Sequence, residues 1–143
     1  MNTTIAILLN ALIAVESCGN PAAIGDIGQA VGILQICPEC VQDVNRITGK
    51  SYTLHDRKNV SKSREICTAY LMHYGKQYER RTGKTATAEI YARIWNGGPY
   101  GYSREGTRVY WRKVQAAMNT GARPRQRVRK ATATPKRRKI ARQ

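Results

Sequence analysis

Acidic residues are scarce in this sequence, which has 9 Asp and Glu against 25 Lys and Arg and a formal net charge of +16. The imbalance is greatest in residues 119–143, which hold 10 basic groups and no acid. Residues 1–118 hold the other 15 basic groups and all 9 acids, a net charge of +6. Any chemistry that requires a carboxylate must therefore draw on a few positions within residues 1–118.

Long hydrophobic runs and repeated metal-ligand patterns are also missing. The apolar run at residues 5–15 is too short to span a bilayer, and no basic segment precedes it as in a signal peptide. We therefore interpret it as a core helix of a protein made in the cytoplasm. His55 and His73 show no ligand pattern, and the Cys-x-x-Cys at residues 37–40 has no second copy. No metal and no cofactor are predicted.

The four cysteines are better explained as small buried side chains than as metal ligands. They stand at positions 18, 37, 40 and 67. Pro38 is suited to the first turn of a helix that also carries Val41 and Val44, which places Cys40 on or near the buried side. A disulfide that joins Cys18 or Cys67 to the Cys-x-x-Cys pair stays open, because connectivity cannot be deduced from sequence.

The length of 143 residues is typical of one domain, and we place that domain at residues 1–118, followed by a basic tail at 119–143. The hydrophobic spacing predicts a mostly helical fold with a short hairpin or loop beside the first helix. Residues 52–57 are predicted to be an exposed connection. Helices are predicted over residues 5–16, 38–48, 60–78, 87–94 and 104–118, and the hairpin over residues 23–31.

Glu16 stands at the end of the first predicted helix, on the same stripe as Leu9 and Leu12. An apolar surrounding and the partial negative charge of a helix C-terminus both disfavour ionisation of its carboxyl. A carboxyl kept neutral near neutral pH is the proton donor that cleavage of a glycosidic bond requires. The alternative is a glutamate at a frayed helix end whose carboxylate reaches into water.

Several short motifs occur in a fixed order along the chain. They are Glu16-Ser17, Asn20-Pro21, the Ala-rich segment 23–30, Gly32-Ile33-Leu34-Gln35-Ile36, Ala92-Arg93-Ile94-Trp95-Asn96-Gly97-Gly98 and Thr107-Arg108-Val109-Tyr110-Trp111. Together they resemble the catalytic core of the lysozyme-like superfamily, in particular goose-type lysozymes, phage lysins and soluble lytic transglycosylases. The resemblance spans residues 5 to about 118. It implies an α+β lysozyme-like fold and an enzyme that degrades peptidoglycan.

The resemblance assigns roles to individual residues. Glu16 would protonate the glycosidic oxygen between MurNAc and GlcNAc. Gln35, which is neutral and both donates and accepts, would hold an acetamido or hydroxyl group of the sugar. Asn96 and Tyr110 would line the cleft, and Tyr110 would support Glu16 by a hydrogen bond. Trp95, which replaces the tyrosine of the family motif, would offer an apolar face to a sugar ring.

Structural alternatives exist for several of these positions. Asn96 precedes two glycines and is a candidate for a simple helix cap. Tyr100 and Tyr102 are further candidates for sugar stacking, and one residue among Trp95, Tyr100 and Tyr102 is expected to pack in the core.

Asp26 decides between two reaction outcomes. An inverting lysozyme needs a second carboxylate to activate water, and Asp26 is the one acid near Glu16, since the next is Glu39. A lytic transglycosylase needs no such base, because the muramyl 6-hydroxyl attacks internally and leaves a 1,6-anhydro product. The soluble transglycosylases have a serine in this hairpin, where this chain has Ile24-Gly25-Asp26. This departure favours hydrolysis and a catalytic Asp26, with a turn residue as the alternative.

The basic tail at residues 119–143 has almost no apolar content and is predicted to be disordered unless a polyanion orders it. Anionic cell-envelope polymers and nucleic acid are its expected partners, and a solubilising tail is the plain alternative. A different class of function is a non-catalytic basic virion or nucleic-acid-binding module. The presence of Glu16 together with Gln35, Asn96 and Tyr110 argues against it.

The expected biological setting follows from the resemblance and from the cytoplasmic origin. A peptidoglycan-degrading enzyme made in the cytoplasm needs help, or cell breakage, to reach its substrate. This pattern is typical of a phage lysin released at host lysis or of a virion enzyme that opens the wall at entry. We expect a monomer without a transmembrane segment.

Overall fold

The structure, a computed structural model, describes residues 3–121. The expectations for the tail from residue 122 onward lie outside the described residues. The elements are α1 (Thr3–Ser17), β1 (Ile24–Gly25), β2 (Ala30–Val31), α2 (Pro38–Thr48), the 3-10 helix η1 (Leu54–Lys58), α3 (Val60–Thr82), α4 (Ala88–Gly97), the 3-10 helix η2 (Gly101–Ser103) and α5 (Thr107–Asn119). The predicted α+β fold, mostly helical with one short hairpin, is confirmed.

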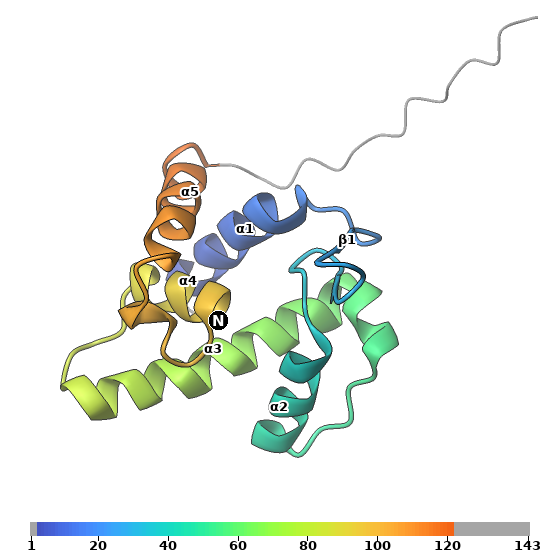
Figure 1. Ribbon diagram of the computed structural model, residues 1–143, viewed down its shortest axis with the longest axis horizontal. Helices are drawn as coiled ribbons and strands as arrows, with labels where there is room; N and C mark the ends of the chain where they lie inside the picture. Colours follow the sequence, from blue (N-terminus) through green and yellow to red (C-terminus); the bar gives the residue numbers. More distant parts are fainter. Residues whose placement is uncertain (1–2, 122–143) are drawn as a thin grey trace, which may run out of the picture.

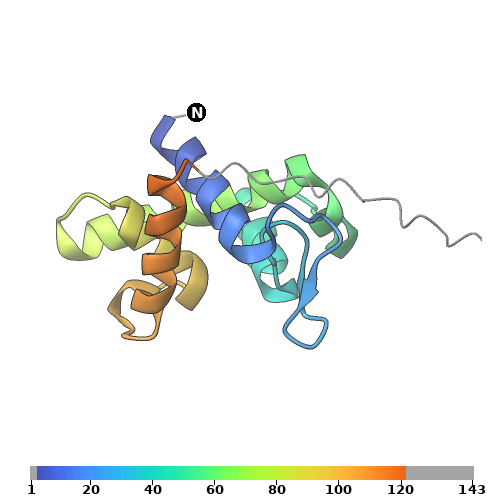
Figure 2. The same ribbon diagram turned by 90° about the horizontal axis from the view of Figure 1, so that it is seen from above.

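The long helix α3 organises the molecule (Figure 1). The helices α4 and α5 lie toward one end of α3, and α2 and the hairpin lie toward the other end (Figures 1 and 2). Helix α1 packs against α5 and α4, while α2 packs against α3. The C-terminal end of α1 lies close to the hairpin in both views. This arrangement brings the end of the first helix, the hairpin and α5 into one region.

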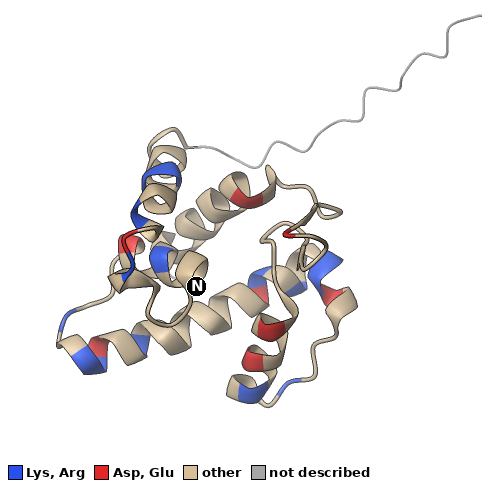
Figure 3. Ribbon diagram, in the orientation of Figure 1, with Lys and Arg blue, Asp and Glu red and all other residues tan. Residues whose placement is uncertain are grey.

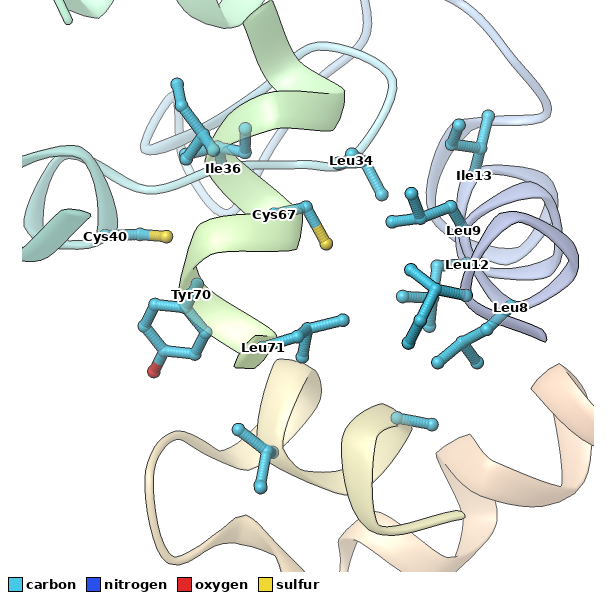
Figure 4. Close-up of a cluster of buried hydrophobic side chains, with 14 of the residues drawn as sticks. Leu8, Leu9, Leu12, Ile13, Leu34, Ile36, Cys40, Cys67, Tyr70 and Leu71 are labelled. Carbon is cyan, nitrogen blue, oxygen red and sulfur yellow. The ribbon is translucent and has the colours of Figure 1, made fainter. Parts of the chain in front are cut away.

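The core forms where α1 meets α3 and the segment after the hairpin (Figure 4). Leu8, Leu9 and Leu12 of α1 are fully buried, and so are Leu34 and Leu71. Each such side chain contributes about 1.5 to 3 kcal/mol by leaving water. The apolar run at residues 5–15 is therefore a core helix, as predicted. Within residues 3–121, no helix combines the length and apolarity needed to cross a membrane.

Local sequence signals predicted the ends of several helices. Helix α2 begins at Pro38 and ends before Gly49, whose φ of 70° is left-handed. The Thr87 side chain accepts a hydrogen bond from the backbone N–H of Ile90 and caps α4 as expected. Helix α5 begins later than predicted, at Thr107, because Arg104 has an extended backbone with φ −94° and ψ 127°.

The expected exposed connection at residues 52–57 is confirmed at residues 53–55, which are exposed, and is wrong at Arg57. Residues from Leu54 onward form η1, and Arg57 is buried with 9% of its surface exposed. Its guanidinium donates hydrogen bonds to the carbonyl oxygens of Gln29 (2.8 Å) and Ile36 (3.0 Å). The backbone of Arg57 also approaches so closely that a Cβ at Gly32 would lie 1.9 Å from its carbonyl oxygen. Arg57 thus holds the base of the hairpin.

The cysteine prediction is confirmed in part. Cys40 and Cys67 are buried, and Cys37 is half-buried. Cys18 is exposed, so the expectation of burial is wrong there, because α1 ends at Ser17 and Cys18 turns away with a φ of 52°. All four thiols are free. No group of side chains within residues 3–121 is arranged to hold a metal ion.

Candidate active site

Glu16 and Tyr110 meet where the C-terminal end of α1 packs against α5. The Tyr110 hydroxyl donates a hydrogen bond of 2.7 Å to Oε1 of Glu16. The contact joins residues that are 94 positions apart in the sequence. The hydrogen bond expected from the resemblance is therefore present.

The surroundings of Glu16 disfavour its charged form. Burial raises the pKa of the Glu16 carboxyl, and the hydrogen bond from Tyr110 lowers it by a smaller amount. Burial and the neighbouring Glu16 also raise the pKa of the Tyr110 hydroxyl, so Tyr110 stays a hydrogen-bond donor. The site can therefore hold a proton on a half-buried carboxyl and keep that carboxyl oriented.

Ser17 connects the end of α1 to the segment after the hairpin. Its hydroxyl donates a hydrogen bond of 2.7 Å to the carbonyl oxygen of Ile33 and accepts one of 3.1 Å from the N–H of Gly19. Because Ser17 directly follows Glu16, this connection positions the last turn of α1 against residues 32–36. Sequence reasoning quoted Ser17 within a motif and gave it no role.

Gln35 lies at the base of the hairpin in a left-handed conformation, with a φ of 50°. Its side-chain N–H group donates to the carbonyl oxygens of Ala23 (3.1 Å) and Gly32 (3.0 Å). Its side-chain oxygen lies so close to Gly25 that a Cβ there would be 2.4 Å away. Gln35 thus holds the two sides of the hairpin together, a role that sequence reasoning missed. Its contact with a sugar stays a prediction.

Asp26 occupies the tip of the hairpin. Asp26 and Ile27 both have left-handed backbones, with φ of 50° and 52°. The turn is closed by hydrogen bonds from Gly28 to Gly25 and from Gln29 to Asp26, each 3.1 Å. The Asp26 side chain is exposed, and its carboxylate makes no hydrogen bond or ion pair with any residue in the described range. The structure therefore leaves this second carboxylate open to solvent and to a ligand.

Trp95 and Asn96 lie in the last turn of α4. Trp95 is half-buried, and its ring meets the ring of Tyr70 edge-on at 5.5 Å. Asn96 is exposed, and its side chain forms no hydrogen bond with residues 3–121. The C-cap residue of α4 is instead Gly98, whose backbone N–H donates a hydrogen bond to the carbonyl oxygen of Ile94. Asn96 is therefore not the helix cap that was considered as its alternative role.

The two neighbouring tyrosines differ in their surroundings. Tyr102 is half-buried and packs edge-on against Tyr78 at 4.8 Å. Tyr100 is exposed, and the guanidinium of Arg81 lies 4.2 Å from its ring centre. One of the three aromatic residues was expected to pack in the core. Two of them, Trp95 and Tyr102, pack against it.

Arg93 is a buried charge that fixes α4 to the start of α5. Its Nε donates to the hydroxyl of Thr107 (2.9 Å), and its guanidinium also reaches the carbonyl of Arg104 (3.1 Å) and the carboxylate of Glu89 (3.2 Å). Because Thr107 begins the helix that carries Tyr110, Arg93 sets the position of the Glu16 partner. The signal in the sequence was an arginine inside the apolar segment 92–95.

The site residues thus fall into two groups. Glu16 and Tyr110 are in direct contact, and Ser17 links them to the segment after the hairpin, which carries Gln35. Asp26 lies at the tip of that hairpin. No hydrogen bond joins Trp95 or Asn96 to Glu16. Both lie on α4, which packs against α1 and α5.

Two lysozymes and one family of domains are similar to this chain. The chain is 49% identical to Lysozyme 1 of Crassostrea virginica over 43 residues, which is 30% of this chain and 23% of that protein. It is 43% identical to the lysozyme of Ostrea edulis over 42 residues, which is 29% of this chain and 31% of that protein. The chain thus aligns with less than a third of the length of either lysozyme. The family described as Transglycosylase SLT domain matches residues 2–141, and the chain therefore belongs to this family of the lysozyme-like superfamily.

Proposed function

We propose that this protein cleaves the glycan strands of peptidoglycan at the β-1,4 bond between MurNAc and GlcNAc, with Glu16 as the general acid. The observation that carries the proposal is the hydrogen bond of 2.7 Å from Tyr110 to a half-buried Glu16 whose pKa is raised by burial. A carboxyl that keeps its proton can donate it to the glycosidic oxygen as the bond breaks. Membership of the SLT family and the lysozyme relatives support this chemistry.

The proposed step begins with the strand bound so that the glycosidic oxygen faces Glu16. Protonation of that oxygen lets the leaving sugar depart while positive charge develops at the anomeric carbon. Tyr110 keeps the Glu16 carboxyl in place before transfer and stabilises the carboxylate left after it, because a hydroxyl donor bonds more strongly to an ionised acceptor. Glu16 is the one acid needed for this half of the reaction.

For the second half we propose hydrolysis, with Asp26 activating the water that attacks the anomeric carbon. Asp26 has an unpaired, solvent-exposed carboxylate on the hairpin that follows Glu16. Ser17 ties the end of α1 to the segment after this hairpin, so the two carboxylates belong to one structural unit. An inverting reaction requires the two carboxyl groups to be separated by roughly 6.5 to 9.5 Å so that water fits between them.

The second candidate is a lytic transglycosylase, and the family match favours it. In that reaction the muramyl 6-hydroxyl attacks the anomeric carbon and Asp26 serves as a turn residue. Its left-handed backbone is consistent with such a role, because Asp tolerates this conformation better than most residues. Both candidates use Glu16 in the same way.

The remaining site residues are proposed to hold the strand. Gln35 has both donor hydrogens of its amide directed at backbone carbonyls, so we assign to it hydrogen-bond acceptance from a sugar. Asn96 offers an amide without a partner among the described residues, suited to an acetamido or hydroxyl group. Trp95 is half-buried and offers the remaining face of its ring.

Mass spectrometry of the fragments released from purified peptidoglycan tests the proposal. A muramidase releases fragments that end in reducing MurNAc, and a lytic transglycosylase releases 1,6-anhydroMurNAc ends. The Glu16→Gln variant, purified in the same way, should release neither. Release of the same fragments by Glu16→Gln would contradict the assignment of the acid.

We propose that residues 1–118 form the catalytic domain and that the basic tail at 119–143 binds anionic envelope polymers or nucleic acid. The tail holds 10 basic groups and no acid, which supports a salt-dependent affinity for polyanions. A chain that ends at residue 118 should keep its activity on soluble glycan fragments and lose binding to intact anionic walls at low salt. Loss of activity on soluble fragments would instead favour a non-catalytic module that acts through the tail.

The proposed setting is the bacterial wall, opened by a phage-encoded enzyme at host lysis or at entry. Two features support this setting. The proposed chemistry degrades the wall, and the strongly basic chain is suited to anionic wall polymers. Proteomic detection of the chain in purified virions would favour entry, and its appearance only in the infected lysate would favour lysis.

A further inference from the structure

The first turn of α2 carries a pair of cysteines in a particular arrangement. Cys37 is the N-cap residue, Pro38 follows at the first helical position, and Cys40 completes the turn. The backbone N–H of Cys40 donates a hydrogen bond of 3.1 Å to the carbonyl of Cys37. A turn closed in this way brings the Cα atoms of residues three apart to within about 7 Å, a separation that a disulfide can span.

The two thiols differ in their access to solvent. Both line a shallow pocket of about 490 Å³ between α2 and α3, whose other lining residues are Glu39, Gln42, Asp43, Arg46 and Tyr70. Cys37 is half-buried, whereas Cys40 is 8% exposed. Figure 3 shows that α2 carries acidic residues along its length. A small molecule in the pocket therefore reaches the Cys37 thiol before it reaches the Cys40 thiol.

Burial also disfavours ionisation of the Cys40 thiol. Burial raises the pKa of the Cys40 thiol, and the nearby Cys37 and Asp43 raise it further. Both residues line the same pocket, so the two side chains share one surface. Cys37, at the N-cap of this 11-residue helix, is half-buried and lies nearer to solvent. Cys37 is thus the more accessible thiol of the pair, and an incoming disulfide meets it first.

We propose that Cys37 and Cys40 form a redox-active dithiol that exchanges with small disulfides such as oxidised glutathione. The Cys37 thiolate attacks one sulfur of the disulfide, forms a mixed disulfide and releases the first glutathione thiolate. Cys40, after losing its proton to solvent, attacks the Cys37 sulfur and releases the second glutathione. Two protein thiols are oxidised to one disulfide, and one glutathione disulfide is reduced to two thiols. In a reducing compartment the pair returns to the dithiol.

The remaining cysteines are poorly placed to compete. Cys67 is fully buried on α3, in the same hydrophobic cluster as Cys40 (Figure 4). Cys18 is exposed, but it follows the end of α1 and does not belong to the first turn of α2.

The oxidised pair would join the N-cap of α2 to its first turn. Ile36, whose carbonyl accepts from Arg57, directly precedes that N-cap.

The sequence permits a direct assignment of the disulfide. The first Lys or Arg in the chain is Arg46, so trypsin releases residues 1–46 as one peptide, and Cys67 falls in the separate peptide 65–76. In a full-length Cys18→Ser variant, Cys37 and Cys40 are the two cysteines of peptide 1–46. The folded variant is incubated with oxidised glutathione, quenched with acid, denatured with N-ethylmaleimide and digested.

The expected result is a peptide 1–46 that is lighter by two hydrogen atoms and unlabelled, beside a peptide 65–76 labelled at Cys67. In Cys18→Ser/Cys40→Ser, Cys37 should retain one glutathione, because the resolving thiol is absent. In Cys18→Ser/Cys37→Ser, Cys40 should remain labelled by the maleimide. Circular dichroism before oxidation establishes that each variant is folded.

Three outcomes would overturn the proposal. They are a disulfide that joins peptide 1–46 to peptide 65–76, two maleimide labels on peptide 1–46 after prolonged oxidation, and glutathione on Cys40 in the variant that lacks Cys37. Cleavage of glycan strands plays no part in these measurements. The redox proposal and the proposed enzymatic function therefore fail or hold independently.

Discussion

The two carboxylates of the candidate site lie in opposite environments. Glu16 is half-buried at the end of a core helix and receives a hydrogen bond from Tyr110. Asp26 stands exposed at the tip of a hairpin, and its carboxylate has no partner among residues 3–121. The same functional group is thus desolvated at one position and left in water at the other.

This difference matches the division of labour in acid–base chemistry. An acid that must arrive protonated benefits from burial, because burial raises its pKa. A base that activates water benefits from access to water. The comparison therefore predicts that the two positions respond differently to the same carboxylate-to-amide substitution.

The largest expected effect is that of Glu16→Gln, which removes the proposed proton donor and keeps the shape of the side chain. Activity on peptidoglycan should fall by about two to four orders of magnitude. Turbidity clearing and fragment release measure it. Glu105→Gln, at a side chain that is 82% exposed, is the matched control and should clear walls like the wild type.

The same variant should not lose stability. Because the pKa of Glu16 is raised in the folded state, the folded protein binds the proton more tightly than the unfolded chain does. Ionisation of Glu16 therefore destabilises the fold, and this penalty grows as the pH rises from the unfolded pKa through the raised folded pKa. Glu16→Gln removes the penalty, so its Tm at neutral pH should equal or exceed that of the wild type. A large drop in Tm would show that loss of fold explains the loss of activity.

The next effect is that of Asp26→Asn, which separates the two candidate reactions. With hydrolysis, activity should fall by about a hundredfold or more, because the base that activates water is lost. Asp26→Gly, which suits the left-handed backbone and also lacks a carboxylate, should behave like Asp26→Asn. If both variants still release fragments, and these carry 1,6-anhydro ends, Asp26 is a turn residue and the enzyme is a transglycosylase.

A smaller effect is expected for Tyr110→Phe, which removes one hydrogen bond from Glu16. Activity requires the protonated acid, so it declines as the pH rises through the Glu16 pKa. The Tyr110 hydrogen bond lowers that pKa, so its loss should move the alkaline limb of the pH profile of kcat/KM to higher pH. The rate should fall about tenfold as the acid loses its orientation, which corresponds to roughly 1.4 kcal/mol.

Tyr102→Phe is the matched control for this change. Tyr102 is also half-buried, and its hydroxyl makes no hydrogen bond within the described residues. Its pH profile should match that of the wild type. An unshifted alkaline limb in Tyr110→Phe would mean that the hydrogen bond does not tune the acid.

Local sequence patterns predicted the parts of the fold that local interactions create. Pro38 and Gly49 mark the two ends of α2, and both act through their own backbone preferences. The partial burial of Glu16 was predicted from the apolar stripe of its own helix. The contact with Tyr110 came from the resemblance to a family, because nothing local connects positions 94 apart.

The missed features depend on contacts between distant parts of the chain. Arg57 reaches carbonyl groups 28 and 21 positions earlier, and Arg93 reaches a hydroxyl 14 positions later. Arg57 stands in a polar segment, so nothing local shows that it will be buried. Arg93 stands in an apolar segment, which hints at burial but does not identify its partners. The hydrogen-bond partners of the Gln35 amide could not be predicted either, because a neutral amide can donate equally well to a sugar or to a backbone carbonyl.

The smallest expected effect concerns the strain next to Asp26. Ile27 is fully exposed and has a φ of 52°, a conformation that a β-branched residue adopts only at a cost. Ile27→Asn should raise the free energy of unfolding by about 1 kcal/mol, because Asn tolerates this backbone. Chemical denaturation measures the change. Ile24→Asn is the matched control, since Ile24 is also exposed but lies in β1, and it should give no such gain.

The activity of Ile27→Asn then tests the comparison between the two carboxylates. Strain that persists at an exposed position, where a better residue would fit, is a common property of functional loops. If the strained turn serves to hold Asp26 toward the glycan, Ile27→Asn should be more stable than the wild type and less active. If Ile27→Asn is more stable and equally active, the strain in the turn does not contribute to catalysis. That result would argue against Asp26 as the base that activates water, and Glu16 would then be the one carboxylate of the site with a catalytic role.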